Sequence, residues 1–345
     1  MKGDYKNNMT YIVTGAAGHL GSHIVKALLK RGERVHAFLL EGEKMPDFIG
    51  ADPNLLLFEG DVRNRGSLEP LFSGSGDTSY TFIHCAGIIS ITQKKNPFIH
   101  EVNVGGTKNV IDVCKEHGVE RLVHVSSVHA IPLLPKGQIM DEISSFDPDK
   151  VTGQYAKTKA EATQLVLDAA KDGLDAVVVH PSGIIGPNAQ GKGNILSMLK
   201  NLVRGRFRVA IHGGYDFVDV RDVADGILRA AQRGKMGECY ILSNRFISLK
   251  EFFDTFTGKA GLKPLKVYLP LFMAKIAAPF AELYYSLARK TPVLTGYSLM
   301  VLSENSLFSH EKATRELGYK TRKLGDTMRD MALWLIGKAK GKDNN

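Results

Sequence analysis

Apolar residues in the first half of the chain follow two spacings in turn. Short runs of β-branched and aromatic residues predict strands at 11–13, 34–40, 54–59, 81–87, 120–127 and 175–180. Between these runs, apolar positions recur at helical spacing, which predicts helices from residue 20 to Gly32 and over 65–72, 97–117 and 154–172. Strands that alternate with helices predict an α/β fold, in which a doubly wound parallel sheet carries helices on both faces.

The pattern changes after Pro181, where residues 182–193 are rich in Gly, Pro and Asn and the following elements are shorter. A helix over 217–233, a strand over 238–242 and a short helix over 249–258 are predicted there. We therefore expect a first domain of residues 9–180 plus about 214–245, a smaller lobe of 181–213 plus 246–337, and a disordered basic tail over 338–345. The apolar segment 267–287 is interrupted by prolines and charges, which favours the wall of a substrate cavity over contact with a membrane surface.

Three glycines, Gly15, Gly18 and Gly21, recur every third residue between the first strand and the first helix. Such a turn lets backbone N–H groups and the positive end of a helix dipole approach a pyrophosphate, which Cβ atoms would obstruct. Glycines between a strand and a helix are also common without a ligand, so only further motifs in the chain can show whether this turn binds a dinucleotide. The next strand ends in Leu39 and Leu40, with neither the acidic residue that binds a ribose 2′-hydroxyl nor the arginine that accepts a 2′-phosphate. NAD and NADP both stay open.

Two further strand ends carry candidate ligand contacts. Asp61 and Val62 follow the third strand, where the carboxylate suits an adenine amine or, equally, the N-cap of the next helix. The fourth strand ends in the small residues Cys85, Ala86 and Gly87, which let a ligand approach the backbone. In the following helix, a pair of glycines at 105 and 106 indicates close packing or a cofactor contact.

Tyr155 and Lys159 lie four residues apart in the predicted helix 154–172, so their side chains share one face. A tyrosine with its ordinary pKa of about 10 is a poor acid or base at neutral pH. A neighbouring ammonium and a place near the helix N-terminus stabilise the phenolate and lower that pKa. Ser127 ends the fifth strand, where its hydroxyl can bond a substrate oxygen while Tyr155 exchanges the proton. The Tyr-Lys spacing alone also fits an ordinary exposed helix, but its position after Gly15 and Ser127 favours a catalytic site.

Composition narrows the class of protein. The chain has 345 residues, 43% of them apolar, which suffices for a proper core. No apolar stretch is long enough to span a bilayer and the first residues do not read as a signal peptide, so a cytoplasmic protein is expected. Three cysteines without metal-ligand spacing indicate core thiols and no metal site. The net charge of +9 is interpreted as a solvated basic surface, because no basic stripe with interleaved aromatics points to nucleic acid.

Taken in order, these motifs resemble the extended short-chain dehydrogenase/reductases, which include nucleotide-sugar epimerases, dihydroflavonol reductases and 3β-hydroxysteroid dehydrogenases. The resemblance covers about residues 10–336 and rests on TGAAGHLG from Thr14, Gly60-Asp61-Val62, His84 to Gly87, Asn103 to Thr107, Ser127, Tyr155 with Lys159, PSGIIGP from Pro181, and FVDVRDVA from Phe217. His19 stands where an aromatic is commoner, and His180 replaces the usual arginine. The resemblance implies a Rossmann-type fold with NAD or NADP as cofactor.

The resemblance also implies roles for individual residues. Tyr155 would be the acid/base, Lys159 would bond the nicotinamide ribose, and Ser127 would orient the substrate oxygen. Asn103 would serve either a proton relay or the stability of its helix. The implied cofactor contacts are Gly15, Gly18, His19, Leu20, Gly21, Asp61, Val62, Cys85, Ala86, Gly87, Tyr155, Lys159, Pro181 and Ile184. A homodimer through the helices 97–117 and 154–172 is a further expectation from the family.

The carboxyl half resembles the dihydroflavonol-reductase and hydroxysteroid-dehydrogenase relatives, in PVLT from Pro292, KATRELG from Lys312 and Trp334. The hypothesis is therefore a hydride transfer between nicotinamide and a carbonyl or secondary alcohol of a bulky, largely apolar small molecule. Arg204, Arg206 and Arg208 could instead hold a diphosphate, which keeps a nucleotide-sugar epimerase or dehydratase as the alternative. A second alternative is a non-catalytic dinucleotide-binding sensor or scaffold.

Overall fold

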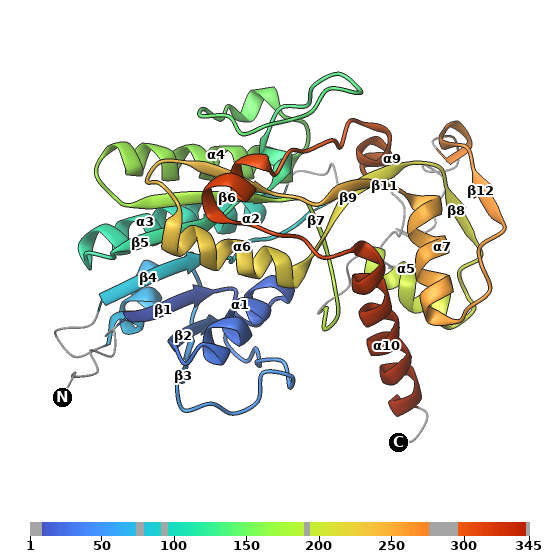
Figure 1. Ribbon diagram of the computed structural model, residues 1–345. Helices are drawn as coiled ribbons and strands as arrows, with labels where there is room; N and C mark the ends of the chain where they lie inside the picture. Colours follow the sequence, from blue (N-terminus) through green and yellow to red (C-terminus); the bar gives the residue numbers. More distant parts are fainter. Residues whose placement is uncertain are drawn as a thin grey trace.

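A seven-stranded parallel sheet forms the centre of the computed structural model, which describes residues 9–73, 79–90, 96–189, 194–274, 276 and 296–342 (Figure 1). Its strands run in the order β10-β6-β5-β4-β1-β2-β3. Their bounds are β1 Met9–Thr14, β2 Arg34–Leu39, β3 Leu55–Glu59, β4 Ser79–His84, β5 Arg121–Val125, β6 Ala176–Pro181 and β10 Cys239–Leu242. The order reverses between β1 and β4, so the chain runs outward from β1 in both directions. The predicted doubly wound α/β fold is confirmed.

Helices cover both faces of this sheet, and side-chain alternation along the strands feeds two separate cores. Ile12, Phe82 and Leu122 face α3 Gly106–Glu116 and α4 Gln154–Lys171. Val13 and Val123, from the alternate positions, face α1 His19–Lys30 and α6 Val220–Arg233. Because both faces of the central strands are buried, most of their residues are apolar, as in other parallel sheets, whereas the edge strand β3 is partly exposed. Short 3-10 turns connect some elements, at Arg65–Phe72, Val128–Ala130 and Pro148–Lys150.

A third core lies to one side of the sheet, among the elements after β6 (Figure 1). These elements are β7 Gly183–Ile185, α5 Asn194–Val203, β8 Val209–Ile211, β9 Gly214–Asp219, β11 Arg245–Ser248, α7 Leu249–Ala260, β12 Val267–Leu269, α9 Gly296–Ser303 and α10 Leu324–Lys342. A π-helical turn, Ala313–Leu317, belongs instead to the core that contains α1 and α6. Strands β11, β9 and β7 form a second sheet, and β12 pairs with β8. The proposed division of the chain into two domains stays a prediction.

Two local predictions are wrong. Residues 217–219, predicted as the start of a helix, end strand β9, because the Asp219 carboxylate accepts the backbone N–H of Arg221 and so begins α6 at Val220. The predicted disordered tail is helical as far as Lys342, as part of α10. The remaining tail residues, 343–345, lie outside the described part of the chain.

The helix predicted over 97–117 is built from α2 Pro97–His100, a π-helical turn Glu101–Gly105, and α3. The side chain of Asn103 is buried and fastens the loop after β4, since it accepts from the N–H of Ile88 and donates to the carbonyl of the same residue. It also donates to Thr158 on α4. Asn103 therefore joins three segments around the sheet edge.

The adjacent glycines of this helix have different surroundings, which yields a matched pair of variants. A Cβ at Gly106 would lie 2.6 Å from Val62 Cγ2, whereas nothing lies within 4 Å of a Cβ at Gly105. We expect Gly106→Ala to lower the free energy of unfolding by about 1 to 3 kcal/mol through overpacking. Gly105→Ala, in helical backbone, should leave it unchanged or raise it by up to about 1 kcal/mol. Urea denaturation measures both, and equal effects would contradict the close contact with Val62.

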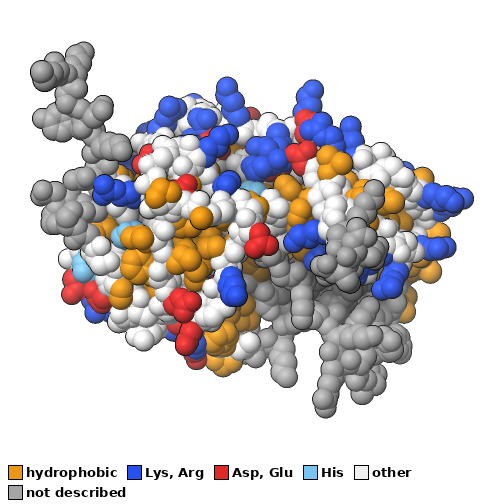
Figure 2. Space-filling model, turned by 90° about the horizontal axis from the view of Figure 1, so that it is seen from below, with side chains coloured by type: hydrophobic (Ala, Val, Ile, Leu, Met, Phe, Trp, Pro, Cys, Tyr) orange, Lys and Arg blue, Asp and Glu red, His pale blue; other side chains and the backbone are white. Residues whose placement is uncertain are grey.

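The basic residues are spread over the surface on the face that Figure 2 shows, among acidic and apolar side chains. On that face they do not join into one continuous stripe. Within the parts of the chain that the structure describes, every helix is too short or too polar to cross a bilayer.

Candidate active site

The glycine turn leaves no room for a side chain at Gly15 or at Gly21. Gly15 has φ +65°, and a Cβ there would lie 2.9 Å from the backbone nitrogen of Ala86 at the end of β4. A Cβ at Gly21 would lie 2.1 Å from the carbonyl oxygen of Gly15. The turn and the first turn of α1 therefore approach each other as bare backbone, at the point where the strand order reverses.

The N-terminus of α1 is open to an anion. Its N-cap is Gly18, which supplies no side-chain hydrogen bond, and the first turn holds no acidic residue. Backbone N–H groups and the helix dipole are thus directed at the cleft, an arrangement that fits the diphosphate of a dinucleotide. His19 and His23 both contact the carbonyl of Pro187 through Nε2, at 3.1 and 3.2 Å. Because a carbonyl only accepts, each ring carries its hydrogen on Nε2 and donates.

A cleft of about 790 Å³ begins at this turn and runs along the carboxyl ends of the strands. Many of the predicted site residues line it: Gly15, Gly18, His19, Leu20, Gly21, Cys85, Gly87, Ser127, Tyr155, Lys159, Pro181 and Ile184. Residues from β1, β4, β5, α4 and β6 thus meet in one place. Apolar side chains also line the cleft, from Ile89, Ala189, Ile195, Leu196 and Met331.

Asp61, Val62 and Ala86 were also predicted to contact the cofactor, and they are not part of this lining. Asp61 pairs with the guanidinium of Arg63 at 2.7 Å, which lowers the pKa of the carboxyl. The alternative prediction, that Asp61 caps the following helix, is wrong, because Asn64 Oδ1 accepts the N–H of Gly66 at that position.

Ser127, Tyr155 and Lys159 are all nearly buried, at 7%, 8% and 6% exposure. Lys159 Nζ donates to the carbonyl of Val125 at 2.9 Å, which ties α4 to the end of β5. The carbonyl of Ser127 accepts from His180 Nδ1 at 3.0 Å, and its hydroxyl accepts from the N–H of His129. His180, at the place where the family usually has an arginine, thus holds the backbone of Ser127.

The ammonium of Lys159 is the dominant charge beneath the cleft. Burial lowers the pKa of Lys159 to about 8. The imidazoles of His84, His124 and His180 lie on neighbouring strands, and burial first, with the Lys159 charge as a further cause, lowers the pKa of each. All three are therefore neutral at pH 7 and leave Lys159 without a competing cation. A Cβ at Gly87 would lie 3.2 Å from Asn103 Oδ1 and 3.4 Å from Lys159 Nζ, so the bare backbone there lies close to both side chains.

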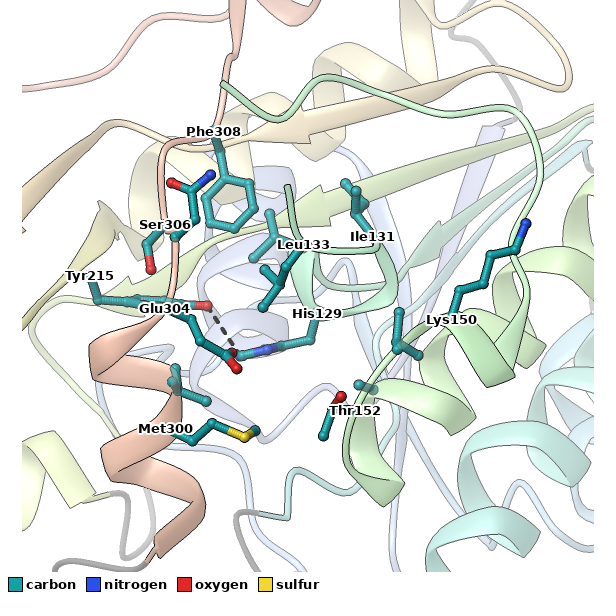
Figure 3. Close-up of a pocket in the computed structure, with 15 residues that line it drawn as sticks. His129, Ile131, Leu133, Lys150, Thr152, Tyr215, Met300, Glu304, Ser306 and Phe308 are labelled. Carbon is teal, nitrogen blue, oxygen red and sulfur yellow. Dashed lines mark hydrogen bonds between the residues drawn. The ribbon is translucent and has the colours of Figure 1, made fainter. Parts of the chain in front are cut away.

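Among the lining residues that sequence reasoning missed, His129 and Tyr215 form a pair next to Tyr155. The Tyr215 hydroxyl and His129 Nε2 are 3.1 Å apart, and their rings stack with centroids 5.9 Å apart (Figure 3). The His129 ring also meets the edge of Tyr155. Burial lowers the pKa of His129 to about 4, so the ring is neutral at pH 7. The only available signals were the position of His129 two residues after Ser127 and of Tyr215 just before the FVDVRDVA segment.

Other predicted site features lie elsewhere. Arg204, Arg206 and Arg208 are exposed and line neither this cleft nor the smaller cavity beside it. Of the apolar segment 267–287, the described residues 267–274 and 276 also line neither space. The rest of that segment lies outside the described residues, so the choice between cavity wall and membrane surface stays open.

The fold and cleft together define a dinucleotide-binding enzyme of the short-chain dehydrogenase/reductase type. The model of the NAD dependent epimerase/dehydratase family matches residues 11–242. The chain belongs to this family, and its cofactor is accordingly NAD or NADP.

Similar proteins span the chain almost completely. A putative dihydroflavonol 4-reductase of Synechocystis is 30% identical over 328 residues, with 94% of each chain covered. The 3 beta-hydroxysteroid dehydrogenase type 7 of Mus musculus is 30% identical over 345 residues, covering 90% of this chain and 91% of the relative. Among solved structures, the UDP-glucose 4-epimerase of Thermus thermophilus in complex with NAD has a TM-score of 0.76 at 22% identity, covering 95% of this chain and 99% of the other.

Replacing Lys159 should change how stability depends on pH. In the unfolded chain its pKa returns from about 8 to the ordinary 10.5, so between these values the unfolded chain binds more protons. Lys159 therefore makes the free energy of unfolding rise with pH over this window, by up to about 1.4 kcal/mol per pH unit. Urea denaturation of cofactor-free protein at several pH values should show this rise in the wild type relative to Lys159→Met. The exposed neighbour variant Lys157→Met should follow the wild type, and parallel profiles for all three would contradict the burial effect.

Proposed function

We propose that this protein is an NAD(P)-dependent oxidoreductase that transfers hydride between nicotinamide and a carbonyl or secondary alcohol of a bulky, largely apolar substrate. The observation that carries the proposal is the meeting of the glycine turn with Ser127, Tyr155 and Lys159 in one cleft. A nucleotide site and an acid/base group are both needed for this reaction, and here they share the same sheet edge.

Each residue of the chain has a distinct task in this proposal. The bound nicotinamide supplies or accepts the hydride. Tyr155 exchanges the proton with the substrate oxygen, and the Ser127 hydroxyl hydrogen-bonds the same oxygen. Lys159 favours the phenolate form of Tyr155 by its charge and bonds the ribose. His180 positions Ser127 through its carbonyl and touches no reactant.

The surroundings of the cleft favour an apolar substrate. Ile89, Ile195, Leu196 and Met331 line it, and an apolar substrate would be held by them through removal of apolar surface from water. A nucleotide sugar would need cations for its diphosphate, and the three arginines considered for that role line no part of the cleft. The two relatives named above are a reductase of a flavonoid and a dehydrogenase of a steroid by name, which agrees with this substrate class.

Tyr155→Phe tests the catalytic assignment. Loss of the phenol hydroxyl should lower kcat for ketone reduction by about 1000-fold or more, because proton transfer loses its donor. The dissociation constant for the reduced cofactor should change little, as measured by its fluorescence. Tyr268→Phe, in β12 and away from the cleft, is the matched control and should keep full activity. Full activity of Tyr155→Phe, or turnover of UDP-sugars and of no ketone, would refute the proposal.

We further propose that the cofactor is NAD and not NADP. The N–H of Leu40, directly after β2, donates to Glu43 Oε2 at 3.2 Å, which fixes a carboxylate at the strand end. The end of β2 adjoins the glycine turn, because the N–H of Ala16 bonds the carbonyl of Phe38. A carboxylate at this place suits the ribose hydroxyls and repels a 2′-phosphate.

Fluorescence titration tests this choice. NADH should bind the wild type at least about 10-fold more tightly than NADPH, since each factor of ten needs only about 1.4 kcal/mol. Glu43→Gln should lower the ratio of the NADPH to the NADH dissociation constant, mainly because NADPH binds more tightly. Glu41→Gln removes a neighbouring exposed carboxylate and should leave this ratio closer to the wild-type value than Glu43→Gln does. Tighter binding of NADPH by the wild type would overturn the proposal.

A further inference from the structure

Six consecutive residues, 181–186, line the cleft, and we call them the lining segment. Polar contacts hold the chain at both of its ends. Directly before it, His180 Nδ1 donates to the carbonyl of Ser127, and directly after it, the carbonyl of Pro187 accepts from two histidines of α1. The position of the middle of the segment depends on a third contact, which lies behind the cleft.

This third contact is made by Asp216, in β9. The Ser182 hydroxyl donates to Asp216 Oδ1 at 2.5 Å, and the N–H of Asn244 donates to the same oxygen at 3.1 Å. Ser182 directly follows β6, and Asn244 is the second residue after β10. One carboxylate oxygen therefore joins the ends of two neighbouring strands of the central sheet to β9 of the second sheet (Figure 1). Hydrogen bonds to an ionised acceptor are short and strong, which suits such a junction.

The backbone of the lining segment also lies directly on β9. Gly183 pairs with Phe217, and a Cβ at Gly183 would lie only 2.8 Å from the carbonyl oxygen of Asp216. Tyr215, the residue before Asp216, lines the cleft as well. A displacement at Asp216 would therefore move two parts of the cleft wall together.

Stability alone does not account for a carboxylate at this place. Asp216 is fully buried, and within the described parts of the chain its other oxygen, Oδ2, has no hydrogen-bond partner. Burial raises the pKa of Asp216 to about 6, although the bonds from Ser182 and Asn244 act to lower it, so the carboxyl is ionised at pH 7. A buried charge with an unpartnered oxygen costs free energy of folding. Unpartnered groups of this kind call for another explanation, and the placement of the lining segment supplies one.

We propose that Asp216 is a positioning residue for the cofactor: through Oδ1 it holds Ser182, and with Ser182 the lining segment, in the place where the segment contacts bound NAD or NADP. Asp216 itself is not part of the cleft lining and acts through Ser182. The inference rests on the proposed function only in so far as the cleft holds the cofactor. It depends neither on the substrate nor on Tyr155.

Two substitutions of Asp216 test the proposal. Asp216→Ala removes the acceptor that Ser182 and Asn244 share, and it should raise the dissociation constant for NADH at least about 10-fold, or about 1.4 kcal/mol. Asp216→Asn keeps an oxygen acceptor of the same size without the charge, and it should stay within about threefold of the wild type. Fluorescence titration with NADH, and with NADPH in parallel, measures both. Unchanged affinity in Asp216→Ala, or equal weakening in the two variants, would overturn the proposal.

A double-mutant cycle tests whether Asp216 acts through Ser182. Ser182→Ala should weaken NADH binding about as much as Asp216→Ala does, and the double variant should bind no more weakly than either single variant. Additive effects would show that Ser182 and Asp216 act separately and would overturn the proposal. Should Asp216→Ala fail to fold, Ser182→Ala decides, since wild-type affinity in that variant would refute the role of the pair.

Thr257→Val is the control for a general loss of stability. It removes another buried hydroxyl, which donates to the carbonyl of Phe253 within α7 and does not line the cleft. This variant should unfold at a lower urea concentration and still bind NADH as the wild type does; weakening equal to that of Ser182→Ala would contradict a specific role for Asp216. Because binding is measured, a wild type that reduces no ketone but shows these binding changes would refute the oxidoreductase proposal and sustain this one.

Discussion

The buried ammonium of Lys159 is the interaction on which the site depends. Removing a charge from water is costly, and the bond to the carbonyl of Val125 offsets part of that cost while it fixes α4 against the end of β5. Since Tyr155 lies one turn earlier on α4, the same bond sets where its phenol stands. The imidazoles of His84, His124 and His180 on the neighbouring strands are neutral, so none of these three adds a second positive charge beside it.

His19, His23 and His180 act as neutral hydrogen-bond donors to backbone carbonyls. His180 holds Ser127, while His19 and His23 both hold Pro187, which brings the segment after β7 against α1. Burial lowers the pKa of His19 and of His180 to about 4, so these bonds persist unchanged through the physiological pH range. The hydrogen bonds that hold the walls of the cleft are therefore made by groups that do not titrate near pH 7.

The strands, the turn and the order of the motifs could be predicted because each rests on local spacing. Apolar alternation placed β1 to β6, and the interval of three between glycines located the first turn of α1. Local pattern failed where a single side chain decides between two structures. Asp219 ends β9 by capping α6, and Asn64 occupies the capping position predicted for Asp61. His129 and Tyr215 were missed for another reason, since 86 residues separate them and only the folded chain brings them into contact.

The amide nitrogen of Asn305 donates hydrogen bonds to the carbonyls of Leu134, Pro135 and Gln138 in the loop after β5, and these bonds bear on the order in which parts of the protein fold. They join carbonyls that lie 167 to 171 residues earlier in the chain, whereas the turn between β1 and α1 is made from neighbours. Contacts of such long separation form late, after the loop-closure entropy has been overcome by other packing. During synthesis, strands β1 to β6 can therefore pair before the segment around Asn305 docks on the loop after β5.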